Sequence, residues 1–92
     1  MPTDLQEKQD RGQERQKRQQ LNSVIGKHVI HTLGQPQDFH AVQVRPLWED
    51  HYRVNVLVGL DAASTRVAHS YFLVADGQGN ILGSTPEITR RY

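Results

Sequence analysis

The chain has no cysteine, no long apolar run and no strong excess of charge of either sign. Without cysteine it can form neither disulfides nor thiolate metal sites. No stretch approaches the roughly 20 apolar residues of a membrane span, and the N-terminus lacks the apolar segment of a secretory signal. The formal net charge is only +1, which argues against a broad electrostatic surface for nucleic acid. These absences predict a soluble, cytoplasmic protein.

Polar residues dominate the start of the chain and divide it into two parts. In residues 1–20 the exceptions are Met1, Pro2 and Leu5. This segment is predicted to be a charged extension, either a fraying helix continuous with the next element or disordered. Residues 21–92 are predicted to form one small α+β domain. A domain of this size buries only about 60% of the surface that its unfolded chain exposes, so a partner surface would stabilise it.

One segment, from Leu21 to Leu33, has the pattern of an amphipathic helix. Its apolar and amphipathic residues recur with a 3.6-residue period and form one stripe: Leu21, Val24, Ile25, His28, Val29, Thr32 and Leu33. Gly34 and Pro36 predict the end of the helix, because glycine suits the left-handed position after a helix and proline cannot continue it. Gly26 is expected to let the helix lie close to a sheet.

Four runs rich in β-branched and aromatic residues follow, separated by turn-forming residues. They predict strands at residues 39–47, 52–58, 67–75 and 81–84, with at most one helical turn after Thr85-Pro86. The expected fold is two-layered: one amphipathic helix packed on a four-stranded antiparallel meander, in the order α-β-β-β-β. The second strand alternates clearly, and its inward residues are predicted to be Tyr52, Val54, Val56 and Val58. The first strand places His40, Val42 and Val44 on one face. Matching that face to the inward face of the second strand requires an odd number of connecting residues if the hairpin has no bulge, either 49–51 or 47–51.

The third strand is apolar on both faces, so its pattern does not decide which face is buried. We predict that its inward residues are Ala68, Ser70, Phe72 and Val74. The opposite face of the sheet then carries an apolar and amphipathic candidate interface of Leu57, His69, Tyr71 and Leu73. Because aromatic residues are favoured in interfaces, this face or an edge strand is predicted to form a homodimer.

No arrangement of residues in the sequence indicates catalysis or a cofactor. His28 and His31 are three residues apart on the predicted helix, a spacing that can place two imidazoles near one metal ion, but no further ligands cluster with them. Glu49, Asp50 and His51 lie in a turn where adjacent side chains diverge. The expected function is therefore a non-enzymatic protein-interaction module, with small-ligand or metal binding through histidines as an alternative.

The N-terminal extension carries the basic residues of a second alternative, nucleic-acid binding. Its cations alternate with acids and no aromatic residue accompanies them, which weakens both phosphate binding and base stacking. The candidate arm consists of Lys8, Arg11, Arg15, Lys17 and Arg18.

Overall fold

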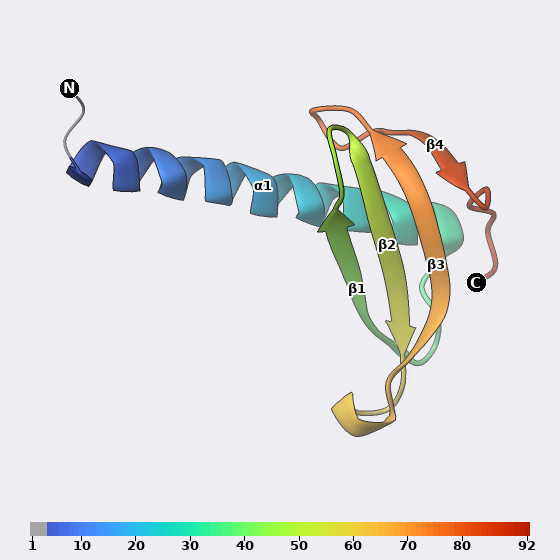
Figure 1. Cartoon of the computed structure of the whole chain (residues 1–92). Coiled ribbons are helices and arrows are strands. Elements are labelled where there is room, and N and C mark those ends of the chain that lie inside the picture. The colour runs from blue at the N-terminus through green and yellow to red at the C-terminus, as the bar shows by residue number, and fades with distance from the viewer. Residues whose placement is uncertain (1–3) are drawn as a thin grey trace.

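A computed structural model describes residues 4–92, with side chains from residue 16 onward. One helix, α1 (Asp4–Leu33), packs on a four-stranded antiparallel sheet whose spatial order is β1-β2-β3-β4. The strands are β1 (Phe39–Pro46), β2 (His51–Val58), β3 (Arg66–Ala75) and β4 (Ile81–Thr85). The predicted α-β-β-β-β fold is confirmed. Figure 1 shows that α1 crosses one face of the sheet and that its N-terminal half projects beyond it.

Helix α1 is continuous through the boundary between the polar extension and the amphipathic segment. Residues 16–20 are exposed, whereas Ile25, Val29 and Leu33 are fully buried against the sheet. Gly26 is buried where the helix meets β1, and a Cβ added there would lie 2.9 Å from Cγ1 of Val42. The prediction that Gly26 permits close approach is thus confirmed.

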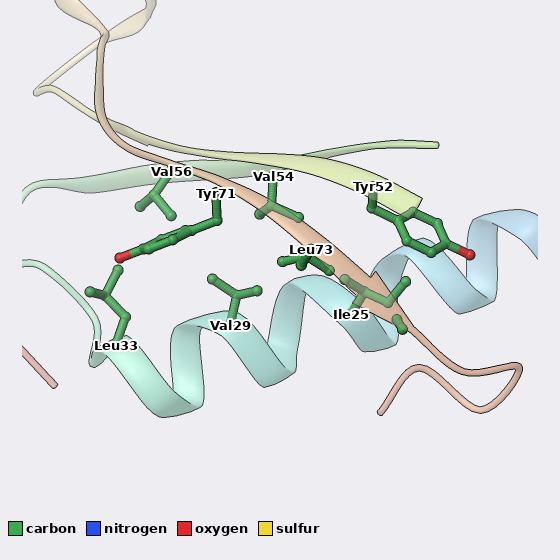
Figure 2. Close-up of a cluster of buried hydrophobic side chains, with 9 residues drawn as sticks. Ile25, Val29, Leu33, Tyr52, Val54, Val56, Tyr71 and Leu73 are labelled. Atoms are coloured by element: carbon green, nitrogen blue, oxygen red, sulfur yellow. The ribbon is translucent and has the colours of Figure 1, made fainter. Parts of the chain in front are cut away.

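The hydrophobic core lies between α1 and the two central strands. Figure 2 shows Ile25, Val29 and Leu33 pointing from the helix toward side chains of the sheet. The sheet contributes Tyr52, Val54, Val56, Tyr71, Leu73 and Ala75 to this cluster. All four predicted inward residues of β2 are buried, because strict alternation sends every second side chain to the same face.

The β1–β2 hairpin joins Pro46 to its partner Tyr52 through the five residues Leu47–His51. An odd number of connecting residues keeps the inward faces of the two strands together, as the sequence predicts. A bulge between Phe39 and Ala41 changes the face of the first residues of β1. As a result Phe39 packs against the core and His40 is exposed, contrary to the predicted inward position of His40.

The C-terminal segment after β4 forms no helical turn, within the predicted limit of at most one turn after Thr85-Pro86. Instead the chain returns to the C-terminal end of α1. There the backbone N–H groups of Arg91 and Tyr92 both donate to the carbonyl oxygen of Leu33, at 2.8 and 3.2 Å. The last carbonyl groups of a helix have no hydrogen-bond partner within the helix, and the C-terminal segment supplies donors for the carbonyl of Leu33.

Candidate functional site

The predicted interface on the far face of the sheet is wrong in its central residues. Tyr71 and Leu73 are 4% and 0% exposed and belong to the core beneath α1. His69 lies on the same side, where its ring stacks on Tyr71. Leu57 alone of the four predicted residues remains on the uncovered face, beside Ala41 of β1.

Strand pairing explains the error. Tyr71 pairs with Val54 and Leu73 pairs with Tyr52, so both inherit the inward face of β2. The third strand carries large apolar residues at both parities, and the sequence pattern could not decide between them. The predicted inward residues Ser70, Phe72 and Val74 therefore lie on the uncovered side of the sheet, which we call the open face.

Three rings gather at one end of the open face. Trp48 of the β1–β2 turn stacks on His51 with a centroid separation of 4.8 Å and an interplanar angle of 20°. Phe72 contacts both rings, at 5.7 Å from Trp48 and 5.6 Å from His51. We call these three residues the aromatic cluster. His51 Nδ1 is buried without a hydrogen-bond partner, while Trp48 remains 57% exposed.

Polar side chains follow the aromatic cluster across the middle of the open face. Arg53 donates from Nη1 to Ser70 Oγ at 3.2 Å, and Ser70 Oγ donates to Asn55 Oδ1 at 2.7 Å. Arg45 lies directly opposite Arg53 on the neighbouring strand. Two like charges in opposed positions destabilise a sheet, so the placement of Arg45 opposite Arg53 adds no stability to the sheet.

A groove of about 680 Å³ runs between α1 and the edge strand β1. Its floor is apolar, with Ile30 from the helix and Phe39, Val42 and Val44 from the strand, all half-buried. Its rim is formed by polar helix residues: Gln19, Asn22, Ser23, Lys27 and His31. The groove therefore leaves part of the core accessible along one edge of the sheet.

The edge of β1 beside this groove has unpaired backbone groups. The N–H of Leu47 donates to the carbonyl of His51 at 2.9 Å, which makes that pair a hydrogen-bonded one. Antiparallel pairs alternate between hydrogen-bonded and non-hydrogen-bonded types, so Gln43 and Arg45 bond to β2. The N–H and C=O groups of Val42 and Val44 then point away from β2. The backbone of Pro46 also points away from β2, so its missing N–H removes no hydrogen bond between β1 and β2.

The histidines occupy separate positions and do not converge. His28 Nδ1 donates to the carbonyl of Gly79 at 2.7 Å, which fixes its tautomer and ties α1 to the β3–β4 turn, whereas His31 is exposed. His69 Nε2 lies 2.8 Å from the hydroxyl oxygen of Tyr92, and burial, with a smaller effect of Arg91, lowers the pKa of His69. In the described part of the chain, no three His, Asp or Glu residues are arranged to hold a metal ion.

The β3–β4 turn is organised by Asp76. Its Oδ1 accepts hydrogen bonds from the backbone N–H groups of Gln78 and Asn80, both at 2.9 Å. Hydrogen bonds from the backbone and side chain of Asn80 are the main reason why the pKa of Asp76 is lowered. This carboxylate is a turn former, and its position suits structure rather than catalysis.

The predicted nucleic-acid arm lies partly outside the residues whose side chains the structure describes. Those of Lys8, Arg11 and Arg15 fall outside them, whereas Lys17 and Arg18 are exposed on α1. No described helix is long and apolar enough to cross a membrane.

Comparison with known proteins gives no further guide to the site. No family model, curated protein or solved structure matches the chain. The sequence pattern did not single out Trp48, Phe72 or the opposed arginines Arg45 and Arg53 as site residues. A signal for a basic sheet was nevertheless present, because all four predicted strands lack Asp and Glu.

Proposed function

We propose that this protein is a self-associating interaction module, not an enzyme, and that two copies join through the β1 edges. The observation that carries the proposal is the coincidence of an unpaired strand edge with an apolar groove alongside it. Exposed edge strands pair readily with other chains unless charge, proline or a covering element prevents it. Here the edge residues that face the groove are apolar.

A second copy fits the edge of β1 by symmetry. A two-fold axis at Gln43 would pair Val42 of each copy with Val44 of the other. Four backbone hydrogen bonds would then form between the copies, from groups that are unpaired in one copy alone. Across this interface Arg45 would lie opposite Ala41 of the second copy, so no like charges would be opposed between the copies. The groove-facing side chains of Val42 and Val44 would then lie beside those of the second copy, and α1 would flank α1 of the second copy.

The opposite edge of the sheet is less suited to pairing. Strand β4 has five residues, against eight in β1. A short edge offers few backbone groups for strand addition. We therefore expect the two copies to associate through β1 and not through β4.

The test is sedimentation equilibrium of the full chain with Val44→Lys, since a lysine that points into the groove should block edge pairing. Wild type is expected to sediment as a dimer at micromolar concentration, and Val44→Lys as a monomer with at least tenfold weaker association. The matched control is Leu82→Lys on β4, where the native side chain is 67% exposed, and it should remain dimeric.

Circular dichroism must show that both lysine variants keep the folded spectrum. A monomeric wild type at high micromolar concentration would disprove the proposal. So would a folded Val44→Lys variant that dimerises as well as wild type.

A further inference from the structure

The strands carry positive charge only, although the chain as a whole is nearly neutral. The four strands contain Arg45, Arg53 and Arg66 and no acidic residue. From residue 16 onward the acids lie in loops and turns: Asp38, Glu49, Asp50, Asp61, Asp76 and Glu87. The strands therefore carry cations and no anions, and Arg45 and Arg53 lie on the open face.

These cations lie in register with the aromatic cluster. Arg45, Arg53 and Phe72 follow one another across three neighbouring strands in a single row. In the next row His51 pairs with Val74. The exposed ring of Trp48 contacts Phe72, and Phe72 is the strand partner of Arg53, so the aromatic cluster adjoins the arginine row.

A third row supplies hydrogen-bonding groups. Gln43, Asn55 and Ser70 lie side by side on β1, β2 and β3. Their amide and hydroxyl groups can both donate and accept hydrogen bonds. The open face thus carries, in adjacent rows, rings for stacking, cations for phosphate and neutral groups for base edges.

The geometry points to single-stranded nucleic acid as the ligand of the open face, with bases stacked on Trp48 and phosphates beside Arg45 and Arg53. Single strands present a planar ring and an anion in every nucleotide, and proteins hold them by combining aromatic stacking with a basic groove. A polyanion without rings would leave Trp48 unused. A duplex keeps its bases stacked inside, so it would offer phosphates only.

The acidic side chains of the β1–β2 turn limit the path that the phosphate backbone of the ligand can take. Glu49 and Asp50 adjoin Trp48 in sequence and would repel phosphate at that end. The ligand backbone therefore runs from the aromatic cluster toward the arginine row and away from the turn. This site is distinct from the predicted arm on α1.

The sole tryptophan of the chain makes the test direct. Full-length protein is titrated with fluorescein-labelled 15-nucleotide single-stranded RNA and DNA, a 15-base-pair duplex, polyphosphate and polyglutamate. Unlabelled samples report Trp48 emission. Single strands are expected to quench Trp48 and to bind at least tenfold more tightly than the duplex or either polyanion, with affinity that falls as salt rises.

Variants then assign the contacts. Trp48→Ala should weaken single-strand binding about tenfold, and Arg45→Gln with Arg53→Gln should reduce the salt slope by about one to two. The charge-matched control, Arg90→Gln with Arg91→Gln, removes two exposed cations of the C-terminal segment and should leave affinity within about twofold. Urea unfolding of each variant confirms that it is folded; Trp48→Leu replaces Trp48→Ala if the latter is not.

Several outcomes would overturn the inference. Absence of single-strand binding at 100 mM salt would do so, as would saturation of the labelled strand with unchanged Trp48 emission. Equal binding of polyglutamate would indicate an acidic peptide ligand instead. Loss of binding in Lys17→Gln with Arg18→Gln, but not in the open-face variants, would move the site to the arm. The Val44→Lys variant separates this inference from self-association, since a monomer keeps the complete open face and should still quench.

Discussion

His69 lies between two tyrosine side chains on the helix-covered side of the sheet. Its ring is parallel to that of Tyr71 at 6.2 Å and meets the Tyr92 ring edge-on at 5.7 Å. Partial burial favours the neutral imidazole, and the charge of Arg91 acts in the same direction, so the pKa of His69 is lowered. This residue therefore links the pH of the solution to the stability of the fold.

We expect stability to fall as the pH drops from 7.5 to 5.0. Because the folded-state pKa of His69 lies below its unfolded value, the unfolded chain binds more protons in this range. The stabilising contribution is present above about pH 6.5 and is lost as the pH falls through the folded-state pKa. The urea midpoint should decrease for wild type and decrease less for His69→Gln.

Asp76 supplies the control for the pH experiment. Its pKa is lowered by its hydrogen bonds with Asn80, so its contribution is lost only as the pH falls below its ordinary value of 3.8. Asp76→Asn should therefore leave the change between pH 7.5 and 5.0 as in wild type. Identical pH responses of wild type and His69→Gln would contradict the assignment to His69.

At the scale of the elements, the end of α1 depends on its junction with the C-terminal segment. Gly34 has φ of +90°, and its N–H donates to the carbonyl of Ile30 at 2.8 Å. A Cβ at this position would lie 2.5 Å from the carbonyl oxygen of Tyr92. Glycine is thus required both by the left-handed backbone and by the close approach of the returning chain.

Gly34→Ala should lower the free energy of unfolding by about 2 kcal/mol, because a side chain in the left-handed region costs about 1–2 kcal/mol and the Tyr92 carbonyl must also move. Urea denaturation measures the change. Gly83→Ala is the matched control, since its Cβ would meet nothing within 4 Å and its φ is not positive. It should alter stability by less than about 1 kcal/mol. Equal effects of the two substitutions would show that the junction is unimportant.

For the whole molecule, the helix covers one face of a small sheet and leaves two surfaces accessible. The open face carries the aromatic cluster and the arginine row, and the β1 edge adjoins the apolar groove. Pairing two β1 edges would place two open faces side by side in one continuous sheet. The proposed dimer and the inferred ligand surface are therefore geometrically compatible.

Association through β1 predicts that thermal stability depends on protein concentration. Ligands and partners that bind only the folded state raise its stability by mass action. We expect the unfolding temperature of wild type to rise by roughly 3–6 °C for each tenfold increase in concentration. Scanning calorimetry between 10 and 1000 μM measures this. Val44→Lys should unfold at a temperature that does not vary, and a concentration-independent wild type would contradict the dimer.

The sequence by itself determined the helix, the four strands and their order. The 3.6-residue stripe of α1, the strict alternation of β2 and the glycine at position 34 each have one physically reasonable interpretation. The odd-numbered connection between Pro46 and Tyr52 also followed from matching the two faces. These features depend on local periodicity and turn chemistry, which are written in consecutive residues.

Only the tertiary structure decided which side of β3 is buried and what the open face contains. Tyr71 and Phe72 are both large and apolar, so the free energy of burial alone favours neither. Tyr71 is the buried one because it pairs with the inward residue Val54, beyond a bulge between Val56 and Leu57. The same pairing places Arg53 beside Phe72 on the open face, which is formed by strands that contain no Asp or Glu. Register between strands is a non-local property, and a shift of one residue exchanges the core with the surface.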